Sequence, residues 1–360
     1  MRMSYKIKKL NPYIPGEQPY KKMIKLNTNE NPYPPTPKIN NLLKTFNYYN
    51  LRLYPDPSTS KLRKAIAKIY NVKYEQIFIG NGSDEVLALA FMTFFNQKIP
   101  LIMPALTYSF YPVYCKLYNI NYKTIPLQKN LEINLNKMNV RNGGVIFANP
   151  NTPTGHAISY IEVTKFLDLH KEYVVLIDEA YINFGSESAI PLIKKYKNLL
   201  IVNTLSKAYS LAGIRIGFAI GSTYLIKGLE KVKNSFNSYP VDVISELIAI
   251  EAIKDINYLK QNCNFIIYIR EKLSKQLKDF GFTVLPSKAN FILVKPKPKH
   301  KQKKPQTNIT AKKMFSKLRK HGILLRYFNH IKKYIRISIG TIQQMNYLIE
   351  TIKFIAKKID

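Results

Sequence analysis

A lysine and an arginine lie in one short glycine-containing stretch of the chain, TLSKAYSLAGIRIG (204–217). The stretch follows an apolar run at 199–203, so Lys207 comes just after the carboxyl end of a predicted strand. A lysine in a dry cleft beside another cation has a lowered pKa and can form a Schiff base with an aldehyde. Arg215 has a glycine on each side within three residues, and such a turn can aim its guanidinium at an anion. Only nine of the 56 basic residues are arginines, so this one indicates geometry that lysine cannot supply.

An acidic residue ends another apolar run, VVLID (174–178). Asp178 is therefore expected at the carboxyl end of a buried strand, where ligands bind in open α/β sheets. Three interpretations are open: a simple strand end, a Mg²⁺-binding acid of an ATPase, or an acid that pairs with the protonated ring nitrogen of pyridoxal 5'-phosphate (PLP). The ATPase interpretation requires GxxxxGK[ST], and the sequence contains no such string.

Two further turns follow predicted strands. GNGSDE (80–85) leads into a helix, and the free N–H groups and the dipole at a helix start can bind phosphate. It is not a dinucleotide fingerprint, because GxGxxG requires glycine where Glu85 stands. NPNTPTG (149–155) has two prolines and a glycine, which make a rigid turn that can hold side chains against a ligand.

Short apolar runs alternate with helical patterns from about residue 60 to 255. The predicted strands are Gln76–Ile79, Leu101–Met103, Val145–Ala148, Val174–Ile177, Leu199–Asn203 and Ile216–Ile220. We expect Ser83 to cap a helix at 84–95, and the Ser159/Glu162 capping box to open another. Alternation of this kind predicts an α/β fold with a mostly parallel sheet covered by helices.

The order changes after residue 256, where a long helix and a compact α+β pattern are predicted. We therefore expect an N-terminal arm at 1–45 that joins a small domain, a large domain at 46–255 and a small C-terminal α+β domain at 256–360. The segment 295–305 has three prolines and dense positive charge, which is typical of an exposed loop.

Composition limits the function classes. The two cysteines are far apart and lack CxxC spacing, so neither a disulfide scaffold nor a zinc module is expected. No apolar run has membrane-spanning length and no signal-peptide pattern opens the chain, so we expect a cytoplasmic protein without membrane contact. The net charge of +34 leaves a nucleic-acid-binding protein as an alternative. The cations are mostly lysines, however, and AT-rich codon bias explains them on a solvated surface, so we expect neither a nucleic-acid partner nor a metal.

The combined motifs resemble the fold-type I PLP-dependent aminotransferases. LNPYIPGEQP (10–19), LNTNENP (26–32) and YPDP (54–57) are similar to the histidinol-phosphate aminotransferase family in particular. The resemblance extends from residue 10 to about 340 and implies a large domain with a seven-stranded type of sheet, a smaller domain and a homodimer.

The resemblance also implies a role for each matching residue. Lys207 would carry PLP covalently and move the proton during catalysis. The other cofactor contacts would be Asp178 at the ring nitrogen, Tyr181 at the phenolic oxygen O3', Tyr108 on the ring face, and Gly82, Ser83, Thr204, Ser206, Arg215 and the neighbouring subunit's Tyr54 at the phosphate. Arg336 would bind the substrate phosphate and the glutamate carboxylate in turn, assisted by Arg326. Tyr13 and Asn29 would line the entrance.

One position departs from the family pattern. The family usually has asparagine before PTG, bonded to O3', and here that position is Thr152. Either its hydroxyl replaces the amide or Asn151 moves in, and we favour Asn151.

The implied reaction is transamination from glutamate to imidazole acetol phosphate, which gives 2-oxoglutarate and histidinol phosphate in histidine biosynthesis. Alternatives of the same fold are a threonine-phosphate decarboxylase and an aromatic aminotransferase.

Overall fold

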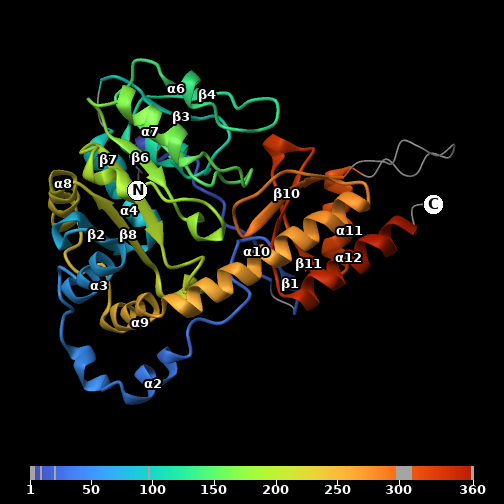
Figure 1. The fold of residues 1–360 in the computed structure, drawn as a ribbon, viewed down its shortest axis with the longest axis horizontal. Coiled ribbons are helices and arrows are strands. Elements are labelled where there is room, and N and C mark those ends of the chain that lie inside the picture. Colours follow the sequence, from blue (N-terminus) through green and yellow to red (C-terminus); the bar gives the residue numbers. More distant parts are fainter. Residues whose placement is uncertain (1–4, 9, 20–21, 96–97, 297–309, 358–360) are drawn as a thin grey trace.

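A computed structural model describes residues 5–8, 10–19, 22–95, 98–296 and 310–357 of the 360-residue chain. A seven-stranded sheet and a smaller four-stranded sheet lie on opposite sides of the molecule, as Figure 1 shows. The long helix α10 (Ile256–Asp279) runs from the first to the second.

The seven-stranded sheet is almost entirely parallel. In spatial order its strands are β2 (Ile77–Asn81), β8 (Ile216–Gly221), β7 (Leu199–Thr204), β6 (Val175–Asp178), β5 (Val145–Ala148), β3 (Leu101–Pro104) and β4 (Tyr122–Ile125). Only β8 runs antiparallel to its neighbours. Six of the seven strands lie where the sequence predicts them. The seventh, β4, is a half-exposed edge strand with polar residues, so it lacks the apolar run that marks a buried strand.

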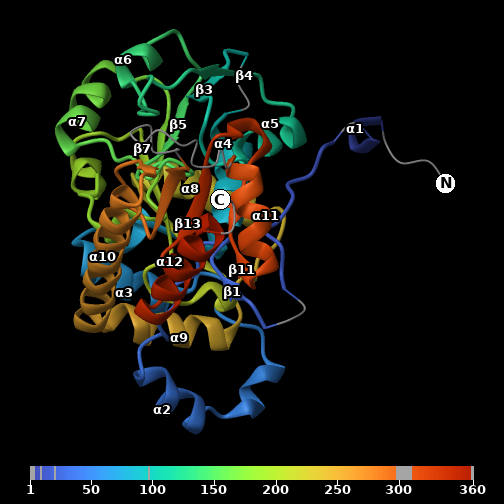
Figure 2. The same ribbon diagram turned by 90° about the vertical axis from the view of Figure 1, so that its right-hand side faces the viewer.

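Helices cover both faces of this sheet (Figures 1 and 2). They are α3 (Ser60–Tyr70), α4 (Gly82–Phe94), α5 (Tyr111–Tyr118), α6 (Leu135–Met138), α7 (Tyr160–Leu169), α8 (Thr223–Asn234) and α9 (Val243–Lys254). Alternate residues of each strand enter opposite cores: Ile177 belongs to one hydrophobic cluster and Leu176 to the other. Burial on both faces explains why these strands read as continuous apolar runs.

Two predicted helix starts have different outcomes. The Ser159/Glu162 capping box is confirmed, since the serine hydroxyl accepts from the Glu162 N–H and the carboxylate accepts from the Ser159 N–H. The predicted Ser83 cap is wrong, because α4 already begins at Gly82. The Glu85 carboxylate accepts from the N–H of Asn81 at 2.6 Å, so the chain enters the helix earlier.

The smaller sheet is antiparallel, with the order β12 (Arg326–Tyr327), β13 (Ile335–Ser338), β10 (Phe291–Lys295) and β9 (Thr283–Val284). The helices α10, α11 (Ala311–Lys320) and α12 (Ile342–Lys357) accompany it (Figure 2). Most of the basic segment 295–305 lies outside the described residues.

The N-terminal segment packs against the C-terminal part of the chain through a pair of short strands. It contains α1 (Tyr5–Lys8) and α2 (Lys38–Thr45), and between them β1 (Ile24–Lys25) pairs in parallel with β11 (Ile323–Leu324). After this pairing, residues 26–31 run from the smaller sheet to the seven-stranded sheet. The Leu26 oxygen accepts from the N–H of Ser338 on β13, and the Asn31 amide donates to the backbone oxygen of Lys207, just after β7. No helix within the described ranges is long and apolar enough to cross a membrane.

Candidate active site

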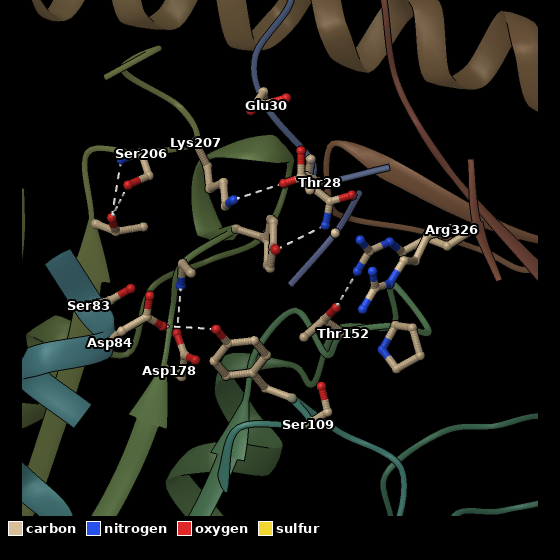
Figure 3. A pocket seen from close by; sticks show the side chains of 18 of the residues that line it. Thr28, Glu30, Ser83, Asp84, Ser109, Thr152, Asp178, Ser206, Lys207 and Arg326 are labelled. Atoms are coloured by element: carbon tan, nitrogen blue, oxygen red, sulfur yellow. Dashed lines mark hydrogen bonds between the residues drawn. The ribbon is translucent and has the colours of Figure 1, made fainter. Parts of the chain in front are cut away.

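A cavity of about 230 Å³ lies where the carboxyl ends of β6 and β7 face the smaller sheet. Twelve of the fifteen predicted site residues line it; Gly82, Asn151 and Tyr54 do not. The residues predicted at the ends of β6 and β7 therefore meet at one edge of the sheet. Figure 3 shows Lys207, Asp178 and Arg326 around this cavity.

The amine of Lys207 faces the middle of the cavity and has a neutral partner. Its Nζ donates to the backbone oxygen of Thr28 at 3.2 Å (Figure 3) and lies 5.9 Å from the centre of the Tyr181 ring. No carboxylate within the described ranges forms an ion pair with it. The Lys207 amine can therefore react without first breaking an ion pair with a carboxylate.

Asp178 ends β6 and is buried beside the cavity. Oδ2 accepts from the hydroxyl of Tyr111 at 2.8 Å, and Oδ1 accepts from the N–H of Ala180 at 3.1 Å. Burial raises the pKa of Asp178 to about 6, and these two hydrogen bonds oppose the rise. A cationic ring nitrogen beside this carboxylate would relieve the cost of its burial.

Arg215 lies among hydroxyl groups at the start of α4. Its Nη1 contacts the hydroxyl of Ser206 at 3.5 Å, and the Ser206 hydroxyl accepts from Thr204 Oγ1 at 3.0 Å. The start of α4 faces the guanidinium so closely that a Cβ at Gly82 would clash with Nη2 of Arg215. Helix N–H groups, two hydroxyls and a guanidinium are the groups that bind phosphate in proteins.

A second arginine lies at the opposite end of the cavity and forms no ion pair with any of the acidic residues that the structure describes. Arg336, on β13, donates to Thr152 Oγ1 at 3.3 Å and to the backbone oxygen of Asn27 at 2.8 Å. Its guanidinium carbon lies 5.2 Å from the ring centre of Phe291 and 5.4 Å from that of Phe328. Burial lowers the pKa of Arg336. An anionic substrate group would offset the cost of burying this cation.

The N-terminal segment supplies the outer wall. Arg326 donates to the backbone oxygens of Ile14 and Pro15 at 3.1 and 3.3 Å. The Tyr13 ring stacks on Phe110 with centres 4.7 Å apart. These contacts place the predicted entrance residue Tyr13 at the cavity.

Asn29 is more deeply placed than an entrance residue, with only 1% of its surface exposed. Its Nδ2 donates to the Tyr181 hydroxyl at 3.0 Å, and its Oδ1 accepts from Ser338 Oγ at 2.8 Å. Asn29 thus links Ser338, on β13 of the smaller sheet, to Tyr181, which follows β6 of the seven-stranded sheet. Tyr181 is the residue predicted to contact O3'. Asn29 therefore lines the cavity from a buried position, and its place among the substrate-binding residues stays a prediction.

Besides Gly82, two predicted cofactor contacts are absent from the cavity lining. The Asn151 amide donates to the Leu106 oxygen and to Thr154 Oγ1, whereas the neighbouring Thr152 lines the cavity. The buried turn thus engages Asn151 internally, and the geometry favours Thr152 at this position. Tyr54 is 82% exposed and stacks on Tyr239.

The sequence reasoning missed several residues of the site. They are Thr28, Asp84, Thr107, Tyr111, Phe291, Phe328 and Ser338. Asp84 could have been found, since it lies within the glycine-rich turn already singled out. The others act through a backbone oxygen, a ring face or a hydroxyl, and none of these has a distinct sequence pattern.

The residues present fit the cofactor that the resemblance implies. Two buried polar atoms of the cavity lining, Thr107 Oγ1 and Arg336 Nε, have no hydrogen-bond partner within the described residues. An amine, a buried acid and a phosphate-binding cradle surround one small cavity. No cluster of metal-ligating side chains is found among the residues described.

The profile of the family described as aminotransferase class I and II matches residues 21–352. The chain belongs to this family. It is 47% identical to the histidinol-phosphate aminotransferase of Chromohalobacter salexigens over 98% of both chains, and 49% identical to that of Clostridium acetobutylicum over 97% of both. These full-length matches confirm the predicted family and its subgroup.

Solved structures confirm the predicted fold of this aminotransferase. The Sinorhizobium meliloti histidinol-phosphate aminotransferase in complex with pyridoxal-5'-phosphate superposes with a TM-score of 0.86 at 23% identity, covering 100% of this chain and 98% of that one. A tetra mutant of the Thermus thermophilus aspartate aminotransferase gives 0.81 at 16% identity, covering 98% of both chains. At such identities the structures show the shared architecture alone.

Proposed function

We propose that this aminotransferase uses PLP to transfer the amino group of glutamate to imidazole acetol phosphate, forming 2-oxoglutarate and histidinol phosphate. The observation that carries the proposal is one cavity with a lysine amine that forms no ion pair within the described residues, a buried carboxylate and two arginines at opposite ends. Full-length relatives named histidinol-phosphate aminotransferase support the choice of substrate.

The residues at the lysine end would hold the cofactor. Bound PLP supplies an aldehyde that accepts an amino group and a ring that withdraws electrons from the substrate Cα. Lys207 Nζ would hold it covalently and then, once released, carry the proton to and from the substrate carbon. Asp178 would keep the ring nitrogen protonated, and Arg215 with Ser206, Thr204 and the start of α4 would bind the phosphate.

The other end would bind both substrates in turn. The bidentate guanidinium of Arg336 suits a carboxylate and a phosphate equally. No acidic side chain in the described part of the chain forms an ion pair with Arg336, so each substrate anion would meet a cation whose charge is not already neutralised. Arg326, fixed by the backbone oxygens of residues 14 and 15, would add charge without moving.

We further propose a cytoplasmic homodimer in which Tyr54 reaches the phosphate of the partner's cofactor. Its exposed ring, away from the cavity of its own chain, supports a role in a second subunit. The two cysteines are free and buried, which suits a reducing compartment. In this proposal residues 46–255 bind the cofactor, and residues 256–360 with the arm at 1–45 carry the substrate arginines.

Borohydride reduction followed by peptide mass mapping tests the proposal. We expect the PLP-derived mass on Lys207, and label on another lysine would reject the site. In a separate, unreduced sample, glutamate should change the visible absorbance of the bound cofactor, and imidazole acetol phosphate should restore it. Release of CO2 from threonine phosphate, without transamination of the imidazole substrate, would instead identify the decarboxylase alternative.

A further inference from the structure

Three tyrosines lie at every third position where the chain enters α5. The hydroxyl of each donates a hydrogen bond near the part of the cavity that would hold the cofactor. Tyr108 donates to Asp84 Oδ1 at 2.9 Å, Tyr111 to Asp178 Oδ2 at 2.8 Å and Tyr114 to the Asp84 backbone oxygen at 2.9 Å. Only Tyr108 lines the cavity. Tyr111 lies behind it, with the two rings edge to face and 5.6 Å between their centres.

The Tyr111 hydroxyl is held in place as a proton donor. The residue is fully buried, and its ring lies 6.1 Å from that of Phe91 in the core between α4, α5 and the sheet. Burial, and then the negative charge of Asp178, raise the pKa of Tyr111 well above its ordinary value. The hydroxyl therefore keeps its proton throughout the working pH range and can donate it only to this carboxylate.

The other groups facing Asp178 are few. Its own loop contributes the N–H of Ala180 and the neighbouring carboxylate of Glu179, α4 contributes the negative charge of Asp84, and the segment after β7 contributes the positive charge of Lys207. Among the described residues, Tyr111 is the only side chain that donates a hydrogen bond to Asp178. Burial and the charge of Asp84 disfavour the ionised form of Asp178, and the hydrogen bond from Tyr111 favours it.

We propose that Tyr111 is a positioning residue that fixes the plane of the Asp178 carboxylate and keeps it ionised, so that the cofactor's ring nitrogen retains its proton. The inference rests on the proposed role of Asp178. A hydrogen bond donated to a carboxylate makes it a weaker base. Without the hydroxyl, the proton shared between carboxylate and ring nitrogen would shift toward Asp178.

The first test uses the protein without cofactor. In Tyr111→Phe, labelled with ¹³C at the aspartate carboxyls and assigned with Asp178→Asn, we expect the Asp178 titration to move upward by roughly one to two pH units. Tyr114→Phe is the matched control, because it removes an equally placed hydroxyl whose acceptor is a backbone oxygen. An unchanged titration in Tyr111→Phe, or an equal shift in both variants, would overturn the inference.

The second test uses ¹⁵N-labelled PLP and reads the resonance of the ring nitrogen. We expect a protonated signal in the unmodified protein and in Tyr114→Phe, and a displacement toward the neutral signal in Tyr111→Phe. A neutral signal in the unmodified protein would instead refute the proposed role of Asp178. The two failures are thereby distinguished.

A further variant covers the case in which Tyr111→Phe does not fold. Placing 3-fluorotyrosine at position 111 keeps the ring and makes the phenol a stronger acid. The Asp178 titration should then move downward. No movement would count against the inference as firmly as an unchanged Tyr111→Phe variant.

Discussion

Asp84 and Arg215 form an ion pair in the predicted phosphate site, with Oδ2 3.3 Å from Nη2. A carboxylate thus contacts the cation that the cofactor phosphate would need. The same carboxylate accepts from Tyr108 through its other oxygen, so the residue links the phosphate site to the ring-stacking tyrosine.

Replacing Asp84 with Asn should strengthen anion binding in the cofactor-free protein. The amide oxygen can still accept from Tyr108, while repulsion of phosphate and competition for Arg215 are removed. We expect inorganic phosphate to bind roughly twofold to threefold more tightly, a small gain because both partners are partly exposed. Isothermal titration at low salt measures this, and weaker binding would show that the carboxylate organises the site instead.

Arg336→Ala should impair both half-reactions. It removes the cation that lies between two aromatic rings and would bind both substrates. Arg336 is half-buried in the free protein, and a bound substrate anion would close the pair off from solvent. Truncating one partner of such a pair costs about 2–5 kcal/mol, so kcat/KM should fall at least thirtyfold for each substrate in single-turnover measurements. Arg336→Lys is the control, since it retains charge without bidentate geometry and should recover only part of the loss. Loss of one half-reaction alone would mean that the substrates do not share this site.

Phe328→Leu should weaken substrate binding without affecting cofactor binding. The ring lies 5.4 Å from the guanidinium carbon of Arg336 and 5.5 Å from that of Arg326, and such contacts contribute about 0.5–2 kcal/mol. KM for both substrates should rise, and the dissociation constant of PLP should stay constant. A changed PLP affinity would reveal a broader structural role.

Glu179 should make the unfolding free energy depend on pH. Burial raises its pKa to about 7, against hydrogen bonds from Ser188 Oγ and the Ala189 N–H. Because the folded state binds the proton more tightly than the unfolded state, stability is lost as pH rises from about 4.5 toward 7. The loss is at most about 3 kcal/mol.

Glu179→Gln should remove this part of the pH dependence. Urea unfolding at pH 5 and pH 8 measures it, with Glu187→Gln, an exposed carboxylate of the same loop, as the control. Parallel pH profiles for the unmodified protein and Glu179→Gln would show that Glu179 keeps its charge in the folded state.

Mixed dimers should reveal whether Tyr54 acts across a subunit boundary. We expect Tyr54→Ala and Lys207→Ala proteins to be poorly active separately. When the two variants are unfolded and refolded together, some dimers contain one subunit of each. One active site of such a dimer has an intact Lys207 and receives the intact Tyr54 of the other subunit, so activity should return. If mixing restores nothing, Tyr54 acts within its own chain or the protein is not a dimer.

The sequence by itself determined which chemical groups meet and at which edge of the sheet. Lys207 and Asp178 each follow a short apolar run, and burial on both faces is what makes such a strand recognisable in sequence. Because parallel strands end together, the polar residues after them converge. The same reasoning failed at β4, whose half-exposed edge position leaves no continuous apolar run.

Only the tertiary structure decided how those groups are held. Thr28 contacts Lys207, Asn29 contacts Tyr181 and Tyr111 contacts Asp178 across separations of 179, 152 and 67 residues. No periodicity or motif encodes such pairs, because they depend on how β1 pairs with β11 and how α5 packs on the sheet. Thr152 rather than Asn151 faces the cavity for the same reason: the fold of a buried turn, and not residue type, directs each side chain.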